Sequence, residues 1–492
     1  MPMKSHPGLL KFLRRLLLSL AAVGTLLAAF VVEENWRGDR AWAATERALR
    51  AQGEPLDLAA FATPPIPDDR NFFKAPLLDG LLSAKEPDPK IKRLRDATTL
   101  DVFSHVMSRS MFDVDHPERR QTNGAKSAPT PKTASDPTGF LHLAQGYLLQ
   151  EKVITTPLSD DPATDILAAL KPVQPLLDAI RDAARERQDA WIPVTAPQNF
   201  GLTFQASLAL DLGSVLSGRS RAELALGHTD DAFADAVGLL GMARATRAGA
   251  PGLLNTLVGN ALRVMGESVL KEGSRQHQWT DVQLSNIGRQ LAEFQLFVQL
   301  RKSFQVERVW VLHNLDSTMV LDPKLRPRVK AGRWLYGLIH GWAQQDKIGH
   351  WQFVQGYLNA FDSASGQMFP ARVSALQKNE EAKVGTRSYY EWVTGEKYAG
   401  KIVSMLTGSG ESENSHREAL IACALERYYL AHGNYPTTLA ELAPAFIATL
   451  PTDVFSGQPL GYSRSSDGGF KLTSLAADGH SEGKTWVQPG SP

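Results

Sequence analysis

The sequence predicts a mainly α-helical protein. It has an N-terminal transmembrane helix, an irregular helical bundle or solenoid-like body, and a small α+β module at the C-terminal end. Three observations support this fold class. A long apolar run follows basic residues near the N-terminus, apolar residues recur at helical spacing through the centre, and two short apolar runs separated by glycines come near the end. A chain of 492 residues is too long for one ordinary core, so we expect several domains.

We divide the chain into consecutive segments by composition. They are a cytoplasmic stub with the transmembrane anchor (1–34), a juxtamembrane helix with a Pro-rich extended segment (35–115), a disordered linker (116–139), a helical domain (140–410) and the α+β module (413–492). The linker is polar, rich in Pro, Ser and Thr, and lacks an apolar period, which is typical of disorder.

The anchor is the stretch from Leu16 to Val32, which contains no charged residue. Its length lies at the short end of a membrane span, about 17–25 residues. Basic residues precede it and acidic residues follow it, namely Lys4, Lys11, Arg14 and Arg15, then Glu33 and Glu34. This asymmetry predicts a cytoplasmic N-terminus, a single pass through the inner membrane, and the bulk of the chain in the periplasm or another extracytoplasmic space. A cleaved signal peptide is the alternative, but the nearest small-residue site, Ala41 to Ala44, follows a charged stretch.

The central region reads as helices. Apolar residues fall at i, i+4, i+7, i+8 and i+11 on one helical face, namely Ala232, Ala236, Leu239, Leu240 and Ala243. This helix and the one before it form a predicted hairpin around Gly227. The hairpin resembles a tetratricopeptide-like repeat, but we find no second copy, so an irregular body is favoured over a regular array. Further helices are expected over 253–271, over 281–312 and between 335 and 379.

The C-terminal segment changes character. One helix is expected to begin near Asn414 and to stop at Gly433, with Asn414 or Ser415 as its cap. A second helix is expected at Thr438, which forms a capping-box pattern with Glu441. The runs "PLGYSRS" and "GFKLTSLA" predict two strands joined by a turn at 467–469.

Composition excludes several functions. The net charge of +1 argues against a nucleic-acid partner. Cys423 is the single cysteine, so no intramolecular disulfide or cysteine-based metal site forms, and its apolar surroundings predict a core residue. "GEKYAGK" (395–401) matches a phosphate-binding loop, but Ile402 replaces the Ser or Thr that holds magnesium, so a nucleotide-dependent enzyme using Lys401 is disfavoured. The five tryptophans between 310 and 392 are expected to pack between helices.

The C-terminal segment resembles the globular head of the major pseudopilins of type II secretion systems. The residues that carry the resemblance lie in "ALERYYLAHGNYPTTLAEL", "LPTDVFSGQPLGYS" and "FKLTSLAADG". Within them, Asp453 belongs to the middle motif and Asp478 to the last. The resemblance implies a calcium site after the A-D-G turn, with Asp478 as a ligand. The family's distal acidic ligands have no counterpart here, and Glu482 is the candidate to replace them; no cofactor other than this calcium ion is expected. The whole chain also resembles a group of uncharacterised membrane-anchored bacterial proteins that share an "ENWRG"-type segment and the "RAELALG" stretch.

We therefore expect a membrane-anchored, periplasm-facing structural or interaction protein of the cell envelope, associated with secretion or pilus-like machinery, and not an enzyme. Its partners are the membrane, through residues 16–32, and envelope proteins, without nucleic acid or nucleotide. An anchored envelope hydrolase is the alternative. Its site would be assembled only by folding, from residues far apart in the sequence: Asp113, His116, Glu307, His313 and His340.

Overall fold

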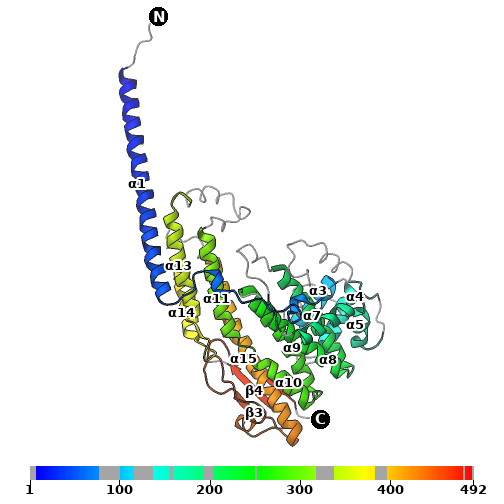
Figure 1. Cartoon of the computed structure of the whole chain (residues 1–492). Coiled ribbons are helices and arrows are strands. Elements are labelled where there is room, and N and C mark those ends of the chain that lie inside the picture. The colour runs from blue at the N-terminus through cyan, green and yellow to red at the C-terminus, as the bar shows by residue number, and fades with distance from the viewer. Residues whose placement is uncertain are drawn as a thin grey trace. The chain divides into compact units, whose positions relative to one another are not determined.

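The computed structural model describes residues 7–76, 100–115, 137–155, 159–187, 189–191, 203–249, 252–316, 337–382, 396–479 and 482–489. These residues are mainly helical, as predicted, with a small sheet near the C-terminal end (Figure 1). They form two compact units. Unit 1 comprises residues 1–60, 307–359 and 374–403, and unit 2 comprises residues 61–306, 360–373 and 404–492.

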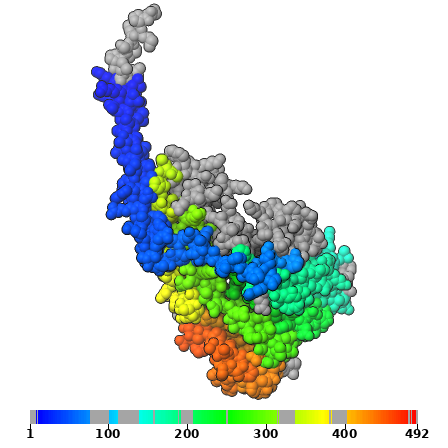
Figure 2. Space-filling model, in the orientation of Figure 1, coloured from blue at the N-terminus to red at the C-terminus, as the bar shows by residue number. Residues whose placement is uncertain are grey.

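Unit 1 is organised by a long first helix, α1 (Pro7–Ala51), and by α13 (His340–Leu358). The helix α1 is long and apolar enough to cross a membrane, and its most apolar stretch is entirely exposed. Figure 2 shows this first part of α1 projecting as a separate rod. The second part of α1 packs against α13. The predicted anchor and juxtamembrane helix are therefore one continuous helix.

The packing of α1 on α13 depends on two glycines. A Cβ atom on Gly341 would lie 2.1 Å from the carbonyl oxygen of Glu34, and one on Gly38 would lie 2.2 Å from the carbonyl oxygen of Gly341. The backbones are therefore in direct contact. Polar contacts flank this crossing. The Nε1 of Trp342 donates to Glu34 over 2.9 Å, and the backbone N–H of Gly341 donates to the Oδ1 of Asn35 over 3.0 Å.

A small apolar cluster completes unit 1. Leu49, Leu312 and Trp351 form its centre, with Trp42 and Leu56 packed against it. Trp342 and Trp351 are both buried, which confirms the predicted packing role for these two tryptophans.

Unit 2 contains most of the helices. They are α3 (Leu100–Asp115), α4 (Pro137–Gln150), α5 (Pro162–Leu170), α6 (Gln174–Glu186), α7 (Thr203–Ala225), α8 (Thr229–Gly249), α9 (Leu253–Arg275) and α10 (Asp281–Ala292). The helices α7, α8 and α9 pack against one another at the centre. Gly227 has a φ of 78° between α7 and α8, a backbone conformation that favours glycine, so the predicted hairpin is confirmed. The five residues of the predicted apolar face on α8 are completely buried.

One expectation for the central helices was wrong. The helix expected over 281–312 is two helices, α10 and α11 (Leu296–Asp316), because the chain turns at residues 293–295 and buries Phe294. The further helices expected between 335 and 379 are confirmed by α13 and by a helix that follows a short hairpin. Its strands are β1 (Phe361–Asp362) and β2 (Gln367–Met368), and α14 (Pro370–Ala382) follows them. Gly366, with a φ of 64°, permits the tight turn.

The C-terminal part is built on α15 (Glu396–His432), a helix of 37 residues. It stops where predicted, at Gly433, which has a φ of 72°. A three-stranded antiparallel sheet follows, in the order β3 (Gly461–Arg464), β4 (Phe470–Leu475), β5 (Glu482–Gln488). The hairpin β3–β4 confirms the predicted pair of strands, whereas β5 was not predicted. The helix expected at Thr438 is one 3-10 turn, η5 (Leu439–Leu442), and Glu441 accepts from the backbone N–H of Thr438 over 2.8 Å.

The expected start of α15 was wrong. Asn414 and Ser415 do not cap a helix, because α15 begins at Glu396 and both residues lie near its middle. Asn414 is buried and joins α15 to the following chain instead. Its side-chain amide donates to Asp453 over 2.9 Å and to the carbonyl oxygen of Leu475 over 3.1 Å. Its Oδ1 accepts from the backbone N–H of Val454 over 2.8 Å.

Replacing Asn414 with alanine is therefore expected to lower the free energy of unfolding by about 1–3 kcal/mol, because the buried N–H of Val454 and a carboxylate oxygen of Asp453 lose a partner. Chemical denaturation of the full chain measures the change. The matched control is Asn434→Ala, whose exposed side chain bonds, among the residues that the structure describes, only to the nearby carbonyl of His432. Equal effects of the two substitutions would contradict the anchoring role of Asn414.

Candidate functional site

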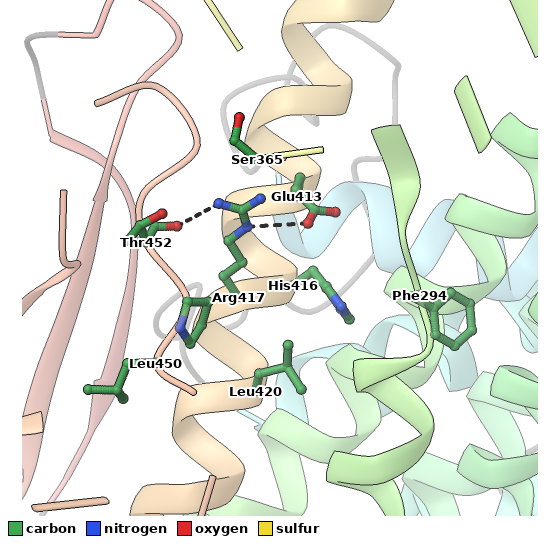
Figure 3. Close-up of a pocket in the computed structure, with 9 residues that line it drawn as sticks. Phe294, Ser365, Glu413, His416, Arg417, Leu420, Leu450 and Thr452 are labelled. Carbon is green, nitrogen blue, oxygen red and sulfur yellow. Dashed lines mark hydrogen bonds and ion pairs between the residues drawn. The ribbon is translucent and has the colours of Figure 1, made fainter. Parts of the chain in front are cut away.

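A pocket of about 340 Å³ opens beside the middle of α15 in unit 2 (Figure 3). Its lining comes from the α10–α11 connection, the β1–β2 turn, α15 and the segment before β3. The lining residues are Phe294, Ser365, Glu413, His416, Arg417, Leu420, Leu450, Pro451 and Thr452.

Glu413 and Arg417 form an ion pair in this pocket. They lie one helical turn apart, and the Nε of Arg417 is 3.3 Å from Glu413 Oε1. The other nitrogens of Arg417 donate to the carbonyl oxygens of Thr452, over 2.7 Å, and Gly366, over 2.5 Å. Two nitrogens of the guanidinium thus hold the two loops to α15. Glu413 Oε2, by contrast, is buried and has no hydrogen-bond partner among the described residues.

A buried charged network lies next to this pocket. His416 Nδ1 is 2.5 Å from Glu267 Oε1, and Arg263 Nη1 is also 2.5 Å from that oxygen. Arg263 is only 1% exposed and bonds further to Asn260 and Ser412. Burial by itself would raise the pKa of Glu267, but the charges of Arg263 and His416 outweigh it and lower the pKa. The network joins α9 to α15 through one carboxylate.

Arg247 on α8 is the third buried arginine of this region. Its guanidinium lies over the ring of Phe294, 4.3 Å from the centroid. Burial, together with the nearby charges of Arg263 and Arg244, lowers the pKa of Arg247 to about 10. The stem of Arg247 packs where Gly259 leaves space, because a Cβ atom there would lie 2.5 Å from its Cγ. The polar pocket therefore lies in positively charged surroundings.

A second, more apolar pocket of about 350 Å³ adjoins the first, since Leu420 and Pro451 line both. It lies between α10, α15 and the segment 446–451. Its other lining residues are Leu284, Ser285, Gly288, Arg289, Ala292, Cys423, Ala424, Arg427, Phe446, Ile447, Ala448 and Thr449. We call the two pockets together the α15 groove. The first pocket, beside Glu413, is its polar end, and the second pocket, which extends to Arg427, is its apolar end.

Cys423 forms part of the apolar wall. It is 4% exposed, and burial raises the pKa of its thiol to about 12. The predicted core position is confirmed, and a thiolate nucleophile is not available at neutral pH.

The predicted calcium ligands lie around the start of β5. Asp478 belongs to the turn after β4, and Glu482 is the first residue of β5, with its carboxylate 3.3 Å from Lys471 Nζ. No group of three or more His, Cys, Asp or Glu side chains that could hold a metal ion occurs within the described ranges. The calcium site stays a prediction.

The residues considered for a hydrolase site are spread over the chain. Asp113 is near the end of α3 in unit 2, while Glu307, His313 and His340 belong to unit 1. The exposed His340 pairs with Asp39 over 3.0 Å. His116 lies outside the described residues. Of the phosphate-loop match, residues 396–401 form the first turns of α15, and Gly395 is not described.

The buried network itself was missed by sequence reasoning. Arg263 and Glu267, like Glu413 and Arg417, are charged pairs at i and i+4 on one helix. That spacing is equally common on solvated helix faces. An available signal was the apolar residues beside Arg263, namely Leu262, Val264 and Met265, whereas Glu413 and Arg417 lie in a polar stretch without such a signal.

Comparison of the chain with models of known protein families, with curated proteins and with solved structures gave no match.

Proposed function

We propose that this protein is a single-pass, membrane-anchored structural or interaction protein of the cell envelope. Its bulk faces the periplasm, and it docks partner proteins beside secretion or pilus-like machinery. The observation that carries the proposal is α1. Its exposed apolar part suits a lipid environment, and its second part is joined to unit 1 by the backbone contact at Gly38 and Gly341. The apolar stretch of α1 is thereby joined to unit 1 by a continuous helix and not by a flexible linker.

The residues just beyond the apolar stretch support this placement. Trp36 is 59% exposed and lies under the guanidinium of Arg40, 5.3 Å from the ring centroid. Tryptophan and arginine side chains favour the region of the lipid headgroups. Glu34, in contrast, faces α13 and is buried by it. The "ENWRG" segment thus supplies one face for the membrane interface and another for unit 1.

The membrane role is tested by placing charges in the apolar stretch. The double substitution Leu20→Arg/Leu27→Arg is expected to release the chain from membranes, because each arginine near the centre of a span costs about 2.5–3.5 kcal/mol. The fraction of full-length chain that remains in the membrane pellet after alkaline carbonate extraction measures this. The control is Ala43→Arg/Ala44→Arg, at exposed positions of the same helix beyond the apolar stretch.

Wild-type chain and the control are expected to stay in the pellet. A wild-type chain that carbonate removes completely would contradict the anchor. Orientation is read in the same preparation, since protease added to spheroplasts should degrade units 1 and 2. Protection of both units in intact spheroplasts would overturn the proposed periplasmic location.

A further inference from the structure

The α15 groove has the dimensions of a short extended peptide. Its polar and apolar ends are marked by Glu413 and Arg427, which lie 14 residues apart on one helix. At about 1.5 Å per residue, this corresponds to roughly 21 Å along the helix. An extended chain covers that length with about six residues, at ~3.3 Å each.

The apolar end is open because its helix wall carries small side chains. Ser285, Gly288 and Ala292 face the groove from α10. A Cβ atom on Gly288 would meet no atom within 4 Å, so space for a larger side chain exists there. The opposite wall, made by Phe446 to Pro451, is largely apolar. Such a groove suits aliphatic side chains of a partner.

The charges of the groove select among apolar partners. Besides His416, which faces Glu267, the charged residues that line it are three arginines and one glutamate: Arg289, Arg417, Arg427 and Glu413. Arg417 pairs with Glu413, and Arg427 pairs with Asp281 over 2.7 Å. Arg289 is exposed and makes no ion pair with any residue that the structure describes. The uncompensated charge at the apolar end is therefore positive.

The polar end offers an acceptor and not a cation site. Glu413 Oε2 is buried and lacks a hydrogen-bond partner among the described residues, so a bound donor would remove an unfavourable desolvation. Arg417 pairs with the same carboxylate, and the charge of Arg247 acts on it. An additional cation would be repelled by these two arginines. A neutral donor, such as a peptide N–H or a hydroxyl group, satisfies Oε2 without that repulsion.

We infer that the α15 groove binds an extended, acidic–apolar peptide segment of a partner protein. Aliphatic side chains fill the space beside Gly288, a carboxylate pairs with Arg289, and a backbone N–H or hydroxyl donates to Glu413 Oε2. The inference rests on the proposed interaction role and names the chemistry of its partner. The proposed binding is non-covalent.

The test selects peptides from a random heptapeptide display library on the full-length protein in lipid nanodiscs. Enriched sequences are expected to combine Leu, Ile, Val or Met with Asp or Glu. The affinity of a fluorescein-labelled selected peptide is then measured by anisotropy for wild-type protein and for variants. Gly288→Leu should fill the groove and weaken binding at least tenfold. Arg289→Glu should weaken the binding of acidic peptides at least tenfold, and it should favour peptides that carry lysine in place of glutamate.

The matched control is Gly408→Leu. Gly408 is an exposed helical glycine of α15, where a Cβ atom would likewise meet no atom within 4 Å, and it does not line the groove. Both leucine variants replace glycine inside a helix, so neither should reduce folding stability. Binding that is unchanged in Gly288→Leu, enrichment of basic peptides, or no enrichment at all would overturn the inference. A chain that does not enter the nanodiscs would contradict the anchor, whereas a chain that enters them and enriches no such peptide would contradict only this inference.

Discussion

Replacement of Arg263 by alanine is expected to lower the free energy of unfolding by about 3–5 kcal/mol, the cost typical of removing one partner from a buried ion pair. Arg263 is 1% exposed, and its guanidinium contacts Glu267, Asn260 and Ser412. Without it, the carboxylate of Glu267 stays buried with His416 as its only partner in the network. Equilibrium denaturation of the full chain, followed by far-UV circular dichroism, measures the loss.

The control for this prediction is Arg185→Ala. Arg185 is a helical arginine of the same unit, but it is exposed and pairs with the half-exposed Asp182 over 3.3 Å. Exposed pairs of this kind contribute less than about 1 kcal/mol. If the two substitutions had the same small effect, the network around Glu267 would not be a stabilising part of the fold.

The second large effect is expected at the crossing of α1 and α13. Replacing Gly341 with leucine introduces a Cβ atom 2.1 Å from the carbonyl oxygen of Glu34. No rotamer relieves a clash between a Cβ atom and backbone, so the helices must separate. Overpacking of buried contacts usually costs about 1–3 kcal/mol, and a backbone clash belongs at the upper end of that range.

The separation is measured by trypsin cleavage in the second part of α1, which contains Arg47 and Arg50. The rate of cleavage follows the population of the form in which α1 has separated from α13. A loss of about 3 kcal/mol in the free energy of this packing should therefore speed cleavage roughly a hundredfold. The control is Gly349→Leu, on the same helix, where a Cβ atom meets nothing within 4 Å. Equal cleavage rates in both variants would show that the close approach at Gly341 does not hold α1.

Local sequence patterns were sufficient for several elements. The apolar stretch of α1 and the buried face of α8 follow from composition and from a 3.6-residue period, which depend only on neighbouring residues. The end of α15 at Gly433 follows from the left-handed conformation that glycine tolerates. The hairpin β3–β4 follows from alternating residues around a glycine turn.

The candidate site could not be predicted in the same way. The helix start that the sequence predicts near Asn414 would place Glu413 and His416 at a helix end. In the structure they lie in the middle of α15, and His416 meets Glu267, which is 149 residues away in the chain. A charged residue in a helix has the same local pattern whether it faces water or a partner helix, so only the packing of α9 against α15 decides between the two.

The sequence by itself thus determined that this protein is mainly helical, which stretch is apolar enough for a membrane, and where the turns at Gly227 and Gly433 occur. Only the tertiary structure decided that charged residues of α8, α9 and α15 gather beside a groove, and that strand β5 completes the sheet. The physical reason is the range of the interactions. Helical periods and glycine turns arise within a few residues, whereas burial of a charge and strand pairing depend on segments brought together by folding.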